Sequence, residues 1–328
     1  MRRRLIAAAV MIAGLHGSAL AQSWPYKPVQ VITPSFAGSP TDIIARVISN
    51  QLNRQLGQTF VVQNQPGGQW LAAITKAEPD GHTLLMQNSS ILSLPVVAVG
   101  GFDPFRDIAA ISPVVRTPLV LVVSPSKYKS LRELVDTAKA KPKSVSYAST
   151  GNNSPSYFAA ERFRRSAGFE ATHIPFRASS EAIAAVLSGQ VDFFYAPISE
   201  LLMGPLLRDQ KLRALALSSP KRSPFLRDVP TTLEEGYKDS DHEVWIGAFA
   251  PAKTPDAVLK RISEELAKAV QSPAAREQIN PFGADPLPMT PIDFTQFLRT
   301  EREKLNLSYI GDPRPGQPEV NTPPPPRQ

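Results

Sequence analysis

Short apolar runs alternate along the chain with segments in which apolar residues recur every three or four positions. The runs at 29–34 and 59–63 have the length of strands. The segment 41–56 between them has the period of a helix. Its apolar residues share one face: Ile44, Val47, Ile48, Leu52 and Leu56. Gly57 follows as a helix stop. This order predicts a βαβ unit with two parallel strands and a right-handed connection.

The same alternation continues through the rest of the chain. Further strands are predicted at 83–86, 119–124, 144–149, 172–176, 191–195, 212–217 and 244–250, and further helices at 131–140, 155–166 and 180–187. Residues beyond 255 are predicted to be helical apart from a short link at 284–289. Two α/β halves are the simplest grouping of these elements.

The N-terminal residues have the pattern of an export signal. Three arginines follow Met1, an apolar run covers 5–15, and Ala19-Leu20-Ala21 fits the small-x-small pattern of signal peptidase sites. The apolar run is about 11 residues long, whereas about 20 are needed to span a bilayer. We therefore predict a signal peptide at 1–21, cleavage after Ala21, and a periplasmic protein.

Composition narrows the function classes further. The formal charge of +7 includes Arg2, Arg3 and Arg4, and no basic run alternates with aromatic residues, so nucleic acid is not an expected partner. Cysteine is absent, which excludes disulfides and thiolate chemistry. Residues 311–328 include seven prolines and are predicted to be a disordered tail.

Two turns each lead from a predicted strand into a predicted helix. They are 37–42 (AGSPTD) and 150–156 (TGNNSPS). Serine followed by proline is good chemistry for a helix start, which explains both Ser-Pro pairs as caps. A glycine also lets backbone approach a ligand, and helix N-termini favour anions. Open α/β sheets bind ligands at the carboxyl ends of strands. The residues alone leave capping and ligand binding equally open.

A set of short motifs recurs in a fixed order between about Trp24 and Leu305. They include 26–28 (YKP), 56–58 (LGQ), 64–67 (NQPG), 79–85 (PDGHTLL), 147–149 (YAS), 189–192 (GQVD), 221–224 (KRSP) and 250–252 (APA), together with the two turns above. With these motifs the chain resembles the Bug family of periplasmic solute-binding proteins, the TctC-like receptors of tripartite tricarboxylate transporters.

The resemblance implies a type II periplasmic-binding-protein fold, α/β, with two domains joined by two crossovers and a ligand cleft between them. The crossovers are expected at 120–126 and 245–252. Domain 1 would then comprise 24–124 plus 247–310, and domain 2 would comprise 125–246. Such receptors bind small carboxylates and deliver them to a membrane transporter or a sensor.

Matching the family's binding loops position by position gives the candidate ligand-binding residues. They are Ala37, Gly38, Ser39, Thr41, Asp42, Trp70, Asn88, Ser89, Thr150, Gly151, Asn152, Ser154 and Arg177. Trp70 is either an aromatic platform for the ligand or a plug that narrows the pocket. Arg177 is either a carboxylate partner or a surface cation, and Asn88 and Ser89 either contact ligand or begin a helix.

Three departures from the family pattern bear on binding. Pro40 and Pro155 stand where both turns usually carry serine, which removes a hydroxyl and an NH from each. The stretch from Asn64 to Asp80, which contains Trp70, is about three residues shorter than usual. These departures motivate an alternative function, a diverged receptor with a remodelled pocket that acts as a periplasmic sensor or interaction protein.

Catalytic signatures are missing from the sequence. The four histidines are scattered without metal-site spacing, and neither a Gly-x-Ser-x-Gly elbow nor a phosphate-binding glycine loop is present. We therefore expect a monomeric binding protein that is no enzyme and needs no cofactor or metal. Its expected partners are a small carboxylate ligand and either the membrane subunits of a tripartite tricarboxylate transporter or a sensor.

Overall fold

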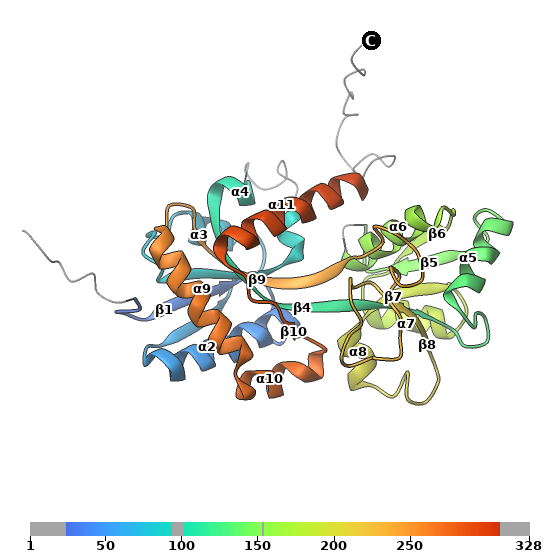
Figure 1. Cartoon of the computed structure of the whole chain (residues 1–328), viewed down its shortest axis with the longest axis horizontal. Helices are drawn as coiled ribbons and strands as arrows, with labels where there is room; N and C mark the ends of the chain where they lie inside the picture. The colour runs from blue at the N-terminus through green and yellow to red at the C-terminus, as the bar shows by residue number, and fades with distance from the viewer. Residues whose placement is uncertain (1–23, 94–101, 153, 309–328) are drawn as a thin grey trace, which may run out of the picture.

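The computed structural model describes residues 24–93, 102–152 and 154–308. The elements form two groups that lie side by side along the long axis of the molecule, with two long strands running between them (Figure 1). The predicted signal peptide at 1–21 and the predicted tail at 311–328 lie outside the described residues. In the described part, none of the helices is both long enough and apolar enough to cross a membrane.

The first half combines both ends of the described chain. Its N-terminal elements are β1 (Val29–Thr33), α2 (Pro40–Leu56), β2 (Phe60–Asn64), α3 (Gln69–Thr75), β3 (Thr83–Asn88), the 3₁₀ helix η1 (Ser89–Leu92) and α4 (Pro104–Asp107). Its C-terminal elements are β9 (Glu243–Pro251), α9 (Asp256–Gln271), α10 (Pro273–Ile279), the 3₁₀ helix η2 (Asn280–Phe282), β10 (Asp285–Pro286) and α11 (Pro291–Ser308).

The second half comes from the middle of the chain, after the long strand β4 (Ile108–Val123). It contains α5 (Leu131–Ala140), β5 (Ser146–Ser149), α6 (Pro155–Ala167), β6 (Thr172–Pro175), α7 (Ser179–Leu187), β7 (Phe193–Pro197), α8 (Ile198–Met203) and β8 (Arg213–Leu217). The helices predicted at 131–140 and 180–187 therefore agree with α5 and α7 to within one residue.

The strands follow one hydrogen-bonded order, β2-β1-β3-β9-β4-β7-β5-β6, and β8 and β10 also pair with β4. β1 and β2 are parallel, with Val29 opposite Phe60, as the βαβ pattern predicts. β5 pairs in parallel with both β6 and β7. β4 and β9 are antiparallel to their neighbours, so the sheet is mixed. The predicted α/β fold class is confirmed.

β4 joins the two halves because it changes partners along its length. Residues up to Pro118 pair with β9, whereas the residues from Leu119 onward pair with β7 and β8. The chain returns to the first half where β9 begins at Glu243, opposite Pro118. Both exchanges lie one or two residues before the ranges expected from the sequence, 120–126 and 245–252.

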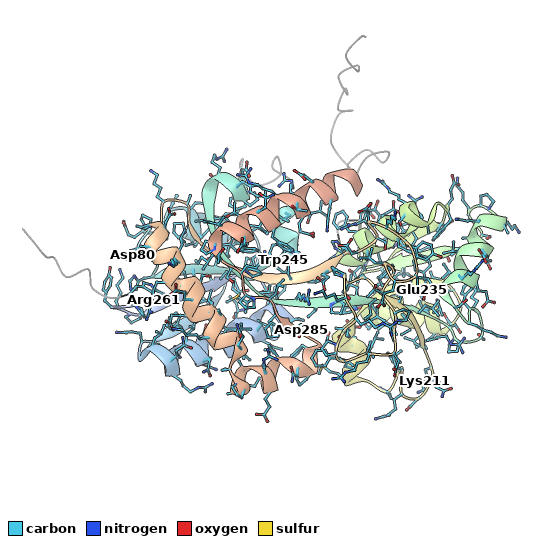
Figure 2. All side chains as sticks on the ribbon, viewed as in Figure 1. Asp80, Lys211, Glu235, Trp245, Arg261 and Asp285 are labelled. Carbon is cyan, nitrogen blue, oxygen red and sulfur yellow. The ribbon has the colours of Figure 1, made fainter. Side chains whose placement is uncertain are left out.

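Apolar packing is organised around these strands. One cluster fills the first half beneath α2 and α9, and a second fills the second half beneath α7. A third extends across both halves and includes Trp245, which packs edge-on against Phe294 of α11 with ring centroids 5.6 Å apart. Trp245 lies near the middle of the molecule, between the halves (Figure 2). The hydrophobic core therefore continues through the junction of the halves.

Candidate functional site

A cavity of about 280 Å³ lies between the two halves. The first half contributes residues from the starts of α2 and η1 and from the turn around η2, and the second half contributes the start of α6 and the end of β7. The crossing strands β4 and β9 supply a wall. The lining residues are Ser35, Ser39, Pro40, Thr41, Ile44, Asn88, Val115, Thr117, Leu119, Thr150, Pro155, Ser156, Phe194, Tyr195, Pro197, Ile198, Ser199, Val244, Ile246, Phe282 and Ala284.

Two helices from opposite halves begin at this cavity with the same local chemistry. Ser39 caps α2 by accepting a hydrogen bond from the Asp42 NH at 3.3 Å, and Ser154 caps α6 by accepting one from the Tyr157 NH at 3.2 Å. Proline occupies the first helical position in both. The next residues, Thr41 and Ser156, line the cavity, and neither backbone NH has an acceptor among the described residues. Both helix starts therefore present a hydroxyl and a backbone NH that has no acceptor in the described part of the chain.

The first turn is held in place by Asp42, which is buried behind it. Its carboxylate accepts hydrogen bonds from the Gly38 NH at 2.9 Å, from Arg46 at 3.1 Å and from Asn64 at 2.8 Å. Burial opposes ionisation, but these donors outweigh it and hold the pKa of Asp42 below its usual value. Asp42 therefore fixes the shape of the loop, and it does not line the cavity.

Hydroxyl groups hold the second turn in place. The Ser156 hydroxyl accepts from the Thr150 NH at 3.1 Å and lies 2.9 Å from the Ser154 hydroxyl. The Ser154 hydroxyl also donates to the Gly151 carbonyl at 2.8 Å. Gly151 has a φ of +116°, which a residue with a side chain rarely adopts. The turn is thus preorganised by its own residues.

The sequence-predicted residues fall into three groups. Ser39, Thr41, Asn88 and Thr150 line the cavity. Six others belong to the two turns without lining the cavity, namely Ala37, Gly38, Asp42, Gly151, Asn152 and Ser154. The remaining three, Trp70, Ser89 and Arg177, lie elsewhere.

Those three residues have other surroundings. Trp70 lies on α3 with 4% exposure and packs edge-on against Phe102, so its ring is part of the core and neither of its proposed pocket roles is seen. Ser89 starts η1 and lines a small separate cavity beside Trp245. Arg177 is exposed in the loop before α7.

Sequence reasoning missed several lining residues. Ser156 could have been found by aligning the two turns, since Ser-Pro-Thr in one matches Ser-Pro-Ser in the other. Ala284 and the wall residues of β4 and β9 carried no such signal. Val115, Thr117 and Leu119 alternate along β4 and so share one face. Only strand pairing across the junction brings that face to the cavity.

The lining residues that the structure describes include no Asp, Glu, Lys, Arg or His, so no side chain there is charged. Arg116 stands between two lining residues of β4, but it pairs with Glu243 and Asp285, each at 3.7 Å. Burial raises the pKa of Glu243 to about 7, even though Arg116 favours its ionised form. Asp285 lies near the middle of the molecule in Figure 2. The positive potential inside the cavity therefore comes from the two helix starts.

Tyr195 is the buried polar side chain in the lining that lacks a hydrogen-bond partner among the described residues. It is fully buried on β7, and burial raises its pKa well above the usual value. Its hydroxyl is therefore a neutral group at physiological pH.

The two halves also touch beside the cavity, where α8 packs on the turn after η2. A Cβ added to Gly283 would lie 2.5 Å from Ile198 Cγ2 and 3.2 Å from Leu202 Cδ1. Gly283 has a φ of +62°. The absence of a side chain at Gly283 thus allows the halves to approach closely on this side.

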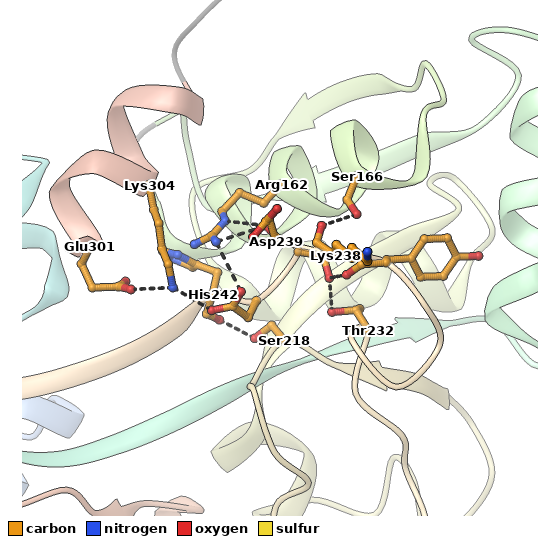
Figure 3. Close-up of polar contacts among 12 residues, drawn as sticks. Arg162, Ser166, Ser218, Thr232, Lys238, Asp239, His242, Glu301 and Lys304 are labelled. Carbon is orange, nitrogen blue, oxygen red and sulfur yellow. Dashed lines mark hydrogen bonds and ion pairs between the residues drawn. The ribbon is translucent and has the colours of Figure 1, made fainter. Parts of the chain in front are cut away.

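On the other side, a polar cluster joins α6, α11 and the segment that returns to β9. Asp241 lies 3.5 Å from Arg162 of α6 and 3.0 Å from Lys304 of α11. Lys304 also lies 3.2 Å from Glu301, and the neighbouring His242 carbonyl accepts from the Ser218 hydroxyl (Figure 3). This cluster fixes α11 of the first half against α6 of the second.

The described residues hold no group of three or more His, Asp or Glu side chains arranged to bind a metal ion. The polar groups at the cavity are hydroxyls, one side-chain amide and backbone NH groups. Such donors suit an anion or a hydrogen-bonding organic ligand.

Known proteins resemble this chain in sequence and in fold. Protein BugT of Bordetella pertussis is 31% identical over 302 residues, covering 90% of this chain and 92% of its own. MatC from Rhodopseudomonas palustris, solved with bound malate, is 27% identical with a TM-score of 0.66, covering 87% of this chain and 99% of its own. An R. palustris protein solved with adipate is 26% identical with a TM-score of 0.70, covering 88% and 97%.

The family model described as the tripartite tricarboxylate transporter family receptor, TctC, matches residues 44–308. That range includes most of the first half and all of the second. The chain therefore belongs to the TctC family of solute-binding receptors.

Proposed function

We propose that this protein captures a small carboxylate in the cavity between its halves and delivers it to the membrane subunits of a tripartite tricarboxylate transporter. The observation that carries the proposal is the pairing of two helix starts, one from each half, at one cavity. Each presents a backbone NH, at Thr41 and Ser156, that has no acceptor among the described residues, and each adds a partial positive charge. A carboxylate bound between them would hold the two halves together.

This role also implies where the protein acts and how its domains are arranged. The chain would be exported with cleavage after Ala21 and would act as a monomer in the periplasm, without catalysis or a cofactor. Residues 24–124 plus 247–310 would form domain 1 and residues 125–246 domain 2. The ligand would be bound by the sequence-predicted residues that line the cavity, together with Ser156. Those residues are Ser39, Thr41, Asn88 and Thr150.

Binding can be tested with the protein from residue 22 onward by calorimetry and thermal shift against a panel of carboxylic acids. A ligand at 100 times its Kd should stabilise the folded protein by about 2.7 kcal/mol. Thr41→Val and Ser156→Ala should each weaken the best acid at least tenfold, about 1.4 kcal/mol. No stabilisation by any acid at millimolar concentration would contradict the proposal.

Ser130→Ala controls for loss of a helix-start hydroxyl away from the cavity, since Ser130 caps α5 by accepting from the Glu133 NH at 3.1 Å. Loss of that cap should cost about 1 kcal/mol of stability and leave affinity unchanged. Delivery can be tested by uptake of the bound acid in cells lacking the gene. Unchanged uptake with a lost transcriptional response would favour the sensor alternative.

A further inference from the structure

The charge balance of the cavity limits which carboxylates can bind, and this inference rests on the proposed function. A helix N-terminus carries about half a positive charge, so the starts of α2 and α6 together offer about one. None of the lining residues is a cation. Asp42 and Arg46 at the start of α2 neutralise each other at 3.0 Å. The cavity can therefore compensate one carboxylate.

A second carboxylate in the ligand would lack a partner. The nearest cation in the β4 wall, Arg116, is already shared between Glu243 and Asp285. A buried charge without a partner is strongly disfavoured. The same reasoning excludes a ligand ammonium, because no lining residue is acidic.

The rest of the lining is mostly hydrocarbon. Apolar side chains come from α2, β4, β7, α8, β9 and η2: Ile44, Val115, Leu119, Phe194, Ile198, Val244, Ile246 and Phe282. Tyr195 is fully buried and neutral, so it adds no charge to the lining. Apolar walls with a few convergent polar groups select a ligand with an apolar body.

We propose that the ligand is a monocarboxylic acid with an uncharged, apolar chain or ring, whose carboxylate lies between the starts of α2 and α6. This selectivity differs from that of the relatives solved with malate and adipate. The preference for one carboxylate follows from the cavity of this chain. Both helix starts there carry a partial positive charge, and no described lining side chain is charged.

A six-carbon series provides a sharp test because its members differ by one group. Calorimetric titration should compare four six-carbon compounds: hexanoate, adipate, norleucine and 1-hexanol. Two further pairs, octanoate with suberate and benzoate with terephthalate, repeat the comparison of one carboxylate with two in ligands of other shapes. We expect the tightest binder to be a monocarboxylate. The dicarboxylate, the amino acid and the alcohol that correspond to this monocarboxylate should each bind at least tenfold more weakly than it does.

A dicarboxylate or amino acid that binds as tightly as its monocarboxylate partner would overturn this inference while leaving the proposed function intact. Failure of every acid to bind would overturn both. Thr117→Lys supplies the reciprocal test, since it adds a cation to the wall of β4. It should shift the hexanoate-to-adipate affinity ratio at least tenfold toward adipate, and an unchanged ratio in the folded variant would contradict the charge argument.

Discussion

Gly283 shows how a single residue can control the approach of the two halves. Its φ of +62° is in the left-handed region, and the space a Cβ would occupy is already taken by Ile198 of α8. Ala at this position must therefore push α8 away from the turn after η2. Since Ile198 and Phe282 line the cavity on either side of this contact, the cavity wall would open.

We predict that Gly283→Ala weakens binding of the best carboxylate at least tenfold, measured by calorimetry. Gly57→Ala is the matched control, because Gly57 has a φ of +67° and nothing lies within 4 Å of its added Cβ. Both variants should lose about 1–2 kcal/mol of stability from backbone strain. Equal affinities in the two variants would show that the α8 contact does not govern binding.

Residue chemistry near the turns was largely readable from sequence. Ser39 and Ser154 cap their helices as the Ser-Pro pattern predicts, because capping depends on neighbours within four residues. The environment of Trp70 was not readable in the same way. Its burial against Phe102 depends on a residue far along the chain, and local pattern carries no information about such a contact.

At the scale of elements, α11 contributes to the junction through its charged face. Lys304 of α11 and Arg162 of α6 approach the same carboxylate, Asp241. Burial opposes ionisation of Asp241, but Arg162 and Lys304 outweigh it and lower its pKa. The helix is therefore attached to the second half by a charge cluster with restricted access to water.

Asp241→Asn should destabilise the protein by about 3–5 kcal/mol, because it leaves two partly buried cations without their shared partner. Urea denaturation at pH 7 measures the change. Asp209→Asn serves as the control, since Asp209 pairs with Arg208 on the surface, where their side chains are 42% and 81% exposed. Such exposed pairs contribute about 0–1 kcal/mol. Similar losses in both variants would contradict a special role for the cluster.

Element prediction succeeded where one apolar period was maintained and failed where it was interrupted. α2 was predicted at 41–56 and observed at Pro40–Leu56. For β4, only the uninterrupted run at 119–124 was predicted, whereas the strand begins at Ile108. Pro113 and Pro118 interrupt the pattern in the missing part. Irregular register on either side of Pro113 lets the ladder with β9 accommodate it.

At the scale of the whole molecule, His242 couples stability to pH at the junction. Burial lowers its pKa to about 3, helped by Arg162 and Lys304 and opposed by Asp241. Because the folded pKa is below the ordinary 6.5, its stabilising contribution is complete above pH 6.5 and is lost as pH falls toward 3. The loss approaches about 1.4 kcal/mol per pH unit below 6.5.

We predict that His242→Gln removes this pH dependence. The stability of the wild type relative to the variant should fall as pH is lowered from 7 to 5, measured by urea denaturation at several pH values. Glu243 has the opposite sign, since its raised folded pKa of about 7 makes its contribution decline as pH rises from 4.5 through 7. Glu243 is present in both proteins, so the difference in their free energies of unfolding isolates the contribution of His242. A stability difference independent of pH would contradict this assignment.

Local sequence patterns specify the alternation of strands and helices, the two capped helix starts and the resemblance to a receptor family. These features depend on periodicity, turn residues and short motifs, which act through near neighbours in the chain. Tertiary structure alone decided that Thr41 and Ser156 share one cavity and that β4 and β9 supply an uncharged wall. Those relations depend on which strands pair across the junction and how closely α8 approaches Gly283, and both are set by packing between residues far apart in sequence.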